Sequence, residues 1–127
     1  MSEKKLLNNI MNREGGIPRA LNVGIEGRVY HGDHSTTMVA FFEPNAGGKL
    51  HQHPQEQWGF VVEGSGWRVH EDHEIPCQKG DFWVTPGGVP HTVRAGAEGL
   101  VLLDIFAPAR EDYRQSGAGW GDAQMQD

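Results

Sequence analysis

The sequence predicts an all-β protein, in which a single domain forms a sandwich or a barrel of short strands. Segments rich in β-branched and aromatic residues follow one another at short intervals, and turn-forming residues separate them. Glycine and proline account for 18 and 7 of the 127 residues, which suits many tight turns. This pattern argues against a parallel α/β sheet.

Eight segments are predicted to be strands. They are Leu21–Tyr30, Thr36–Glu43, Trp58–Glu63, Trp67–His70, Glu74–Gln78, Phe82–Thr85, His91–Arg94 and Leu100–Phe106. Gly64-Ser65-Gly66 is expected to be a turn, and Gly96 and Gly99 are expected to form another. Gly64-Ser65-Gly66 does not indicate a nucleotide-binding loop, because the third glycine and the following helix are missing.

The two ends of the chain are expected to lie outside the domain, which we place at residues 21–113. Residues 1–20 form an N-terminal extension that is helical or irregular. A short helix is expected over Glu3–Arg13, because Leu6, Leu7, Ile10 and Met11 recur at helical spacing. Residues 114–127 are Gly- and Gln-rich and are expected to form a flexible tail.

Composition restricts the partners of the protein. The formal charge of −6 argues against binding to nucleic acid, and no apolar run is long enough to span a membrane. The N-terminal residues lack the apolar centre of a signal peptide. The single cysteine, Cys77, cannot form an internal disulfide. These features predict a cytoplasmic protein that acts on a small molecule.

The stretch from His51 to Gln57 is the strongest candidate for a functional site. His51 and His53 are two residues apart, so on an extended segment both imidazoles point to the same side. Glu56 and Gln57 follow, and either could add an oxygen ligand. His91 follows a Gly- and Pro-rich turn and is a third imidazole candidate. The pairs His31/His34 and His70/His73 lie in or beside predicted turns and are interpreted as solvated residues.

Imidazole donors favour Zn, Ni, Fe or Cu over Ca or Mg. The predicted cofactor is one divalent transition metal, with Zn, Ni, Fe and Mn as the candidate ions. With Gln57 as the oxygen donor, the ligand set would be neutral. The metal would then keep its full charge, act as a strong Lewis acid and attract anionic substrates.

Two blocks of residues resemble the two motifs of the cupin family. The first block consists of His51, His53, Gln57 and Gly64, and the second of Gly80, Asp81, Pro86, Gly88 and His91. Asn45 replaces the leading glycine of the first motif, and Ala95 the final asparagine of the second. The resemblance implies a jelly-roll β-barrel, usually a homodimer, that holds a metal on His51, His53, His91 and one further ligand. The spacing to Gly64 assigns that ligand to Gln57 rather than Glu56.

A closer resemblance is to the small bacterial cupins of pectin and alginate breakdown. It rests on His-x-His-Pro-x-Glu-Gln-x-Gly, on Val-Pro-His at 89–91, and on the segment from Asp104 to Tyr113. Those proteins open the ring of 4,5-unsaturated uronates and so favour the linear keto form. The resemblance implies that Asp104 is catalytic, that Phe106 is its aromatic neighbour and that Arg110 binds substrate. Ala107 and Ala109 replace a frequent serine and proline.

The last predicted strand is apolar on both faces, so Asp104 is expected to be buried. A buried acid needs a partner or a function, and Asp104 could form a salt bridge with Arg110 or Arg94 or could move protons. The Arg110 guanidinium suits a carboxylate, although a solvated arginine at the strand exit fits the sequence equally well. The aromatic residues Trp58, Phe60, Trp67 and Trp83 are expected in the barrel wall and dimer interface.

Three functional hypotheses follow. The first is a metal-dependent isomerase that opens unsaturated uronate rings, with an anionic sugar as substrate. The second is an Fe- or Ni-dependent dioxygenase that uses the same metal ligands. The third is a non-catalytic cupin that binds a sugar or another small ligand.

Overall fold

The computed structural model describes residues 6–120 together with 124 and 125. Its strands are β1 (Ile17–Asn22), β2 (Ile25–His31), β3 (Thr36–Phe42), β4 (His51–Gln52), β5 (Glu56–Val69), β6 (Glu74–Gln78), β7 (Phe82–Thr85), β8 (Thr92–Ala107), β9 (Gly117–Ala118) and β10 (Gln124–Met125). A 3-10 turn, η1 (Glu111–Tyr113), follows β8. The described residues contain no α-helix, which confirms the predicted all-β class.

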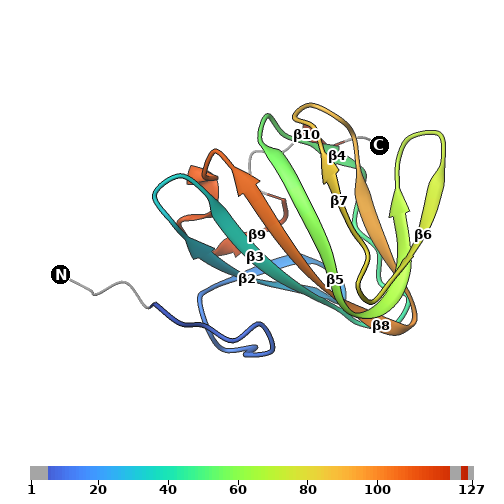
Figure 1. The fold of residues 1–127 in the computed structure, drawn as a ribbon, viewed down its shortest axis with the longest axis horizontal. Coiled ribbons are helices and arrows are strands. Elements are labelled where there is room, and N and C mark those ends of the chain that lie inside the picture. Colours follow the sequence, from blue (N-terminus) through green and yellow to red (C-terminus); the bar gives the residue numbers. More distant parts are fainter. Residues whose placement is uncertain (1–5, 121–123, 126–127) are drawn as a thin grey trace.

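One bent sheet makes up most of the molecule. It contains 8 strands, with the order β6-β5-β8-β3-β2-β1-β9 and with β7 paired to β5. The sheet folds over at the bends of β5 and β8, so its two arms face each other as the layers of a jelly-roll sandwich (Figure 1). Strands β6 and β9 stand at opposite ends of this order. The sheet therefore stays open and does not form the closed barrel that the sequence led us to expect.

Strands β5 and β8 are the longest and each passes from one arm of the sheet to the other (Figure 1). The turns expected at Gly64–Gly66 and at Gly96 and Gly99 are wrong, because both segments lie inside continuous strands. Register shifts between Val61 and Gly66 bend β5 without ending it. The sequence predicts that the chain reverses direction at these glycines. Instead, bulges and glycines bend the strands, which continue in the sheet.

Both ends of the chain differ from expectation. The described part of the expected helix, residues 6–13, contains only bends and turns, and Leu6 and Leu7 are 94% and 82% exposed. A single short helix is not stable without such packing. Strand β1 begins at Ile17, inside the expected extension. Strand β9 pairs in parallel with β1, so this part of the expected flexible tail belongs to the sheet.

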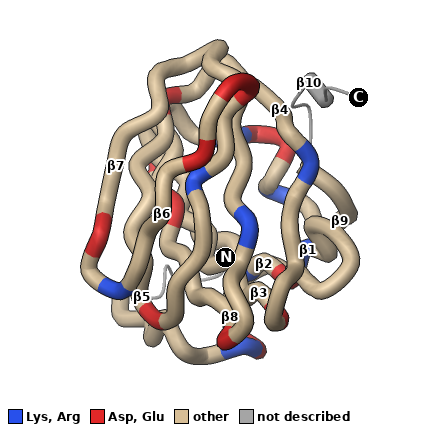
Figure 2. Tube along the Cα trace, turned by 90° about the vertical axis from the view of Figure 1, so that its right-hand side faces the viewer, with Lys and Arg blue, Asp and Glu red and all other residues tan. Residues whose placement is uncertain are grey.

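The core lies between the two arms and is formed by apolar residues of β2, β3, β5 and β8, including Val29, Met38, Val61 and Leu102. Basic and acidic residues are interspersed along the trace, with both signs on the side that Figure 2 presents. No helix among the described residues is long and apolar enough to cross a membrane.

The bend of β5 depends on Gly64. Its φ is +83°, and a Cβ at this position would lie 2.2 Å from the carbonyl oxygen of Gly99. We predict that Gly64→Ala lowers the free energy of unfolding by about 2 kcal/mol or more, because the clash and the strained backbone add. Urea unfolding measures the change. Gly32→Ala is the control, since its nearest atom would be 3.4 Å away and its φ is not positive. Equal stability of the two variants would contradict the prediction.

Candidate metal centre

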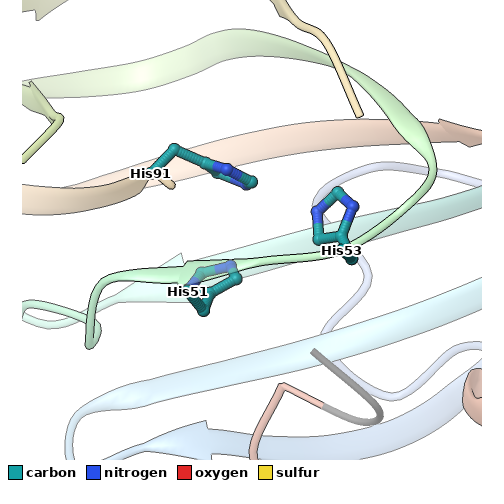
Figure 3. A group of neighbouring side chains, drawn as sticks. All are labelled: His51, His53 and His91. Carbon is teal, nitrogen blue, oxygen red and sulfur yellow. The ribbon is translucent and has the colours of Figure 1, made fainter. Parts of the chain in front are cut away.

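Three buried histidines meet inside the sandwich. His51 lies on β4, His53 just after it, and His91 just before β8. The backbones of His51 and His91 pair directly, with N···O distances of 3.1 and 2.9 Å. One ligand nitrogen from each of the three histidines lies within 4.8 Å of the others. Figure 3 shows the three rings converging from two segments that are distant in sequence.

Backbone carbonyls orient each ring in the same way. The Nδ1 atoms of His51, His53 and His91 face the carbonyl oxygens of Lys49, Gln55 and Val89 at 2.7, 3.0 and 2.7 Å. A carbonyl only accepts, so each Nδ1 carries the proton of the neutral ring. The Nε2 lone pairs therefore point to the centre of the cluster, as in histidines that bind metals.

Gln57 completes the donor set from β5. Its Oε1 lies 2.8 Å from Nε2 of His53 and 3.0 Å from Nε2 of His91. Both nitrogens present lone pairs, and the Gln57 oxygen can also only accept. These three acceptor atoms therefore meet with no proton between them, and a bound cation stabilises such an arrangement. Glu56, the rival ligand, is exposed. Three imidazoles and an amide oxygen fit a divalent transition metal.

Burial keeps the histidines neutral. It lowers the pKa of His51 to about 4 and that of His91 to about 3, and it also lowers the pKa of His53. The charge of Arg110 lowers the pKa of His53 further. At neutral pH the rings are therefore ready to bind a metal without first losing a proton.

Asp104 lies on β8 and lines the same small cavity as His51, Gln57 and His91. Burial raises its pKa to about 7, while a hydrogen bond with the Gln57 side chain and the charge of Arg110 act in the opposite direction. Because the carboxylate accepts, the Gln57 amide nitrogen donates and leaves the amide oxygen for the metal. Asp104 Oδ1 has no partner. Neither of the salt bridges that the sequence left open forms, since Arg94 pairs with Glu74 and Arg110 with Asp112.

Phe106 and Arg110 lie on the other side of His53. The Phe106 ring meets that of His53 edge-on, with 5.4 Å between centroids. The buried Arg110 guanidinium packs on the rings of Phe106 and Tyr113, 5.0 and 4.0 Å from their centroids. Its Nη2 donates to the Asp112 carboxylate at 2.9 Å and to a backbone carbonyl, that of residue 120, at 2.7 Å. Arg110 is therefore not the solvated arginine that the sequence left open.

Trp120 closes one side of the centre, which the sequence did not predict. Its ring stacks on that of His51 with 4.5 Å between centroids and 15° between planes. Arg19 holds the segment before it by donating to the carbonyls of Ala118 and Gly119 at 3.1 and 2.8 Å. Trp120 lines the cavity beside the histidines. The volume of this cavity is about 20 Å³, which is space for about one water molecule.

The remaining histidines do not join the centre. His31 is half-buried and bonded to Thr36 and to the Tyr113 carbonyl, so its interpretation as a solvated residue is wrong. His70 bonds the carbonyl of Pro90, whereas His73 is exposed beside Asp72. Within the described residues only His51, His53 and His91 form a group able to hold a metal.

This fold and this cluster of donors define the class of the protein. The family model of the cupin domain matches residues 38–106, so the chain belongs to the cupin family. The all-β cupin fold and the family expected from the sequence are thereby confirmed.

Three individual proteins are similar to this chain in structure or in sequence. The structure of KdgF from Halomonas sp. superposes with a TM-score of 0.71 and 27% identity, covering 80% of this chain and 94% of that one. An RmlC-like cupin from Shewanella frigidimarina gives 0.74 and 24%, covering 89% and 99%. Oxalate decarboxylase OxdC of Bacillus subtilis is 30% identical over 69 residues, which are 50% of this chain but only 18% of that relative.

The metal-free protein should lose stability as the pH falls from about 6.5 to 4. Over this range the unfolded histidines, with a pKa of 6.5, bind protons that buried His51 and His91 do not. Asp104 acts oppositely, because its folded pKa of about 7 exceeds its usual 3.8. Two imidazoles against one carboxyl leave a net difference of one bound proton, which corresponds to a slope of about 1.4 kcal/mol per pH unit near pH 5.

Denaturant unfolding at several pH values measures this slope. His91→Gln serves as the comparison and should flatten it, because one of the responsible imidazoles is removed. A free energy of unfolding that stays level or rises on acidification would refute the assignment.

Trp120 should control access to the metal. We predict that Trp120→Ala speeds metal removal by a chelator roughly tenfold, since the stacked ring that covers His51 is lost and the segment opens more easily. The release rate, followed with a chromogenic chelator, is the measurement. Trp67→Ala is the matched control, because Trp67 packs against Arg94 and does not line the cavity. Indistinguishable rates for Trp120→Ala and the parent protein would disprove the covering role.

Proposed function

We propose that this cupin is a metal-dependent enzyme that opens the ring of 4,5-unsaturated uronates and favours the linear keto form. The observation that carries the proposal is Asp104, a fully buried acid with a free oxygen that lines the cavity beside the histidine cluster. The similarity to KdgF and the sequence resemblance to uronate cupins support the same substrate class.

The proposed chemistry divides between the metal and the chain. A metal on His51, His53, His91 and Gln57 would polarise substrate oxygens as a Lewis acid. Asp104 takes the proton of the hemiacetal hydroxyl as its C=O bond forms and the ring C–O bond breaks to give an enol. It then returns a proton to the carbon of the former C=C bond, which gives the keto form. Its pKa of about 7 suits it to both roles near neutral pH.

Phe106 and Arg110 support this site in the proposal. Phe106 limits the position of the His53 ring and excludes water from that side. Arg110 contributes positive charge near His51 and His53 and anchors the segment that carries Trp120. For substrate binding by Arg110, as the family resemblance implies, the Nε is without a partner, whereas the Nη2 would have to exchange the backbone carbonyl of residue 120 for a substrate carboxylate.

The homodimer and the cytoplasmic location also remain proposals. Trp58 and Phe82 are 39% and 62% exposed on the outer face of β5 and β7, and Phe60 stacks on Phe82. A second copy could cover these rings.

The metal-loaded protein should accelerate loss of the C=C absorbance of 4,5-unsaturated galacturonate. Asp104→Asn should lower kcat by about 10²–10⁴-fold, because the amide cannot move a proton. Asp72→Asn, at an exposed carboxylate, is the control and should leave kcat unchanged.

An absence of acceleration by the metal-loaded parent protein would sink the proposal. Oxygen uptake with a phenolic or diketone substrate would then indicate a dioxygenase. Binding of the sugar without turnover, unaltered in Asp104→Asn, would indicate a binding protein.

A further inference from the structure

The cavity beside the histidine cluster has a second polar wall. His51, Gln57, His91 and Asp104 line one part of it, and Arg68 of β5 and Thr85 of β7 line another. Arg68 lies outside the two motif blocks matched in the sequence, and the sequence did not single it out. The cavity therefore places a guanidinium close to the metal donors without any role in holding them.

Arg68 lacks an anionic partner. Its Nη2 donates to the Val84 carbonyl and to Thr85 Oγ1, both at 3.2 Å, and its Nε is buried without any hydrogen-bond partner. Across the described residues no carboxylate forms an ion pair with it. Arg94, Arg110 and Arg114 differ in this respect, because each pairs with an acid. A partly buried guanidinium left without a counter-charge stabilises an anion that enters beside it.

The metal donors add to this charge imbalance. His51, His53, His91 and Gln57 are all neutral, so a divalent metal would keep its two positive charges. Arg68 adds a third positive charge to the same cavity, and the Asp104 carboxylate can cancel at most one of the three. The cavity as a whole therefore favours an occupant with a negative charge.

Arg110 is less well placed for this task. Its Nη2 already contacts the Asp112 carboxylate and a backbone carbonyl, and it lies outside the cavity that Asp104 lines. Both guanidiniums have an Nε without a partner, but the two acceptors of Arg68 are neutral and are more easily exchanged for a charged one than the Asp112 carboxylate that Arg110 holds.

We infer that Arg68 binds the carboxylate of the substrate at the part of the cavity wall that it forms with Thr85. This inference rests on the proposed function and deepens it, because it assigns the recognition of the acid to one residue. The planar guanidinium donates from Nε and Nη2 to the two carboxylate oxygens. The ring of the sugar then lies between Arg68 and the metal, within reach of Asp104. The small cavity admits the sugar when the Trp120 segment moves aside.

Binding to the Co²⁺-loaded protein tests the inference without turnover. The visible absorption of Co²⁺ is titrated with D-galacturonate, which is saturated and does not react, with D-galactose, which lacks the carboxylate, and with acetate. The parent protein should bind galacturonate more tightly than galactose. Arg68→Met should weaken galacturonate about tenfold or more and leave galactose unchanged, because only the charged contact is lost.

Two further variants make the result specific. Arg68→Lys should recover part of the affinity, since it restores the charge without the two-point geometry. Arg94→Met removes the same charge from an exposed residue paired with Glu74 and should bind galacturonate like the parent. Circular dichroism and thermal unfolding establish that each variant is folded.

The outcomes separate the inference from the proposed function. Equal galacturonate affinity of the parent and Arg68→Met, or no preference of the parent for galacturonate or acetate over galactose, would overturn the inference. Arg68-dependent binding of acetate or galacturonate, together with no acceleration of uronate opening, would uphold the carboxylate site and reject the proposed reaction.

Discussion

The centre depends on one repeated interaction, the hydrogen bond from Nδ1 of each site histidine to a backbone carbonyl. It fixes the tautomer, so that the Nε2 lone pairs of His51, His53 and His91 face one point. Burial then keeps the rings neutral. Gln57 can offer its oxygen to the same point because Asp104 accepts from its amide nitrogen. The fold thus prepares a binding geometry before any metal arrives.

The sequence was sufficient for the parts of this site that follow local rules. Alternation places His51 and His53 on one side of an extended segment, and the cupin spacing adds Gln57 and His91. The apolar pattern of β8 correctly placed Asp104 in the interior. The alternation is a short-range relation, whereas His91 is distant in sequence and was found only through the spacing of the second motif; the structure brings these residues together.

The parts that the sequence did not predict depend on long-range geometry. Trp120 lies in a segment with the composition of a tail, and contacts with residues elsewhere in the chain, among them Arg19, Arg110 and strand β1, hold it in place. Arg68 was missed for a different reason. It is eleven positions after Gln57, so strict alternation would put the two side chains on opposite faces. The irregular register of β5 changes this alternation and turns Arg68 inward.

The bend of β5 therefore also decides which side chain reaches the cavity. If one residue were added or removed between Val61 and Gly66, the half of β5 beyond the bend would present its opposite face, and Trp67 would replace Arg68 inside. Gln57 lies before the bend, and the three histidines lie outside β5, so all four ligands would keep their positions. In this fold, a change in the length of one strand could convert a site for an acid into a site for an uncharged ring, with the metal donors unaltered.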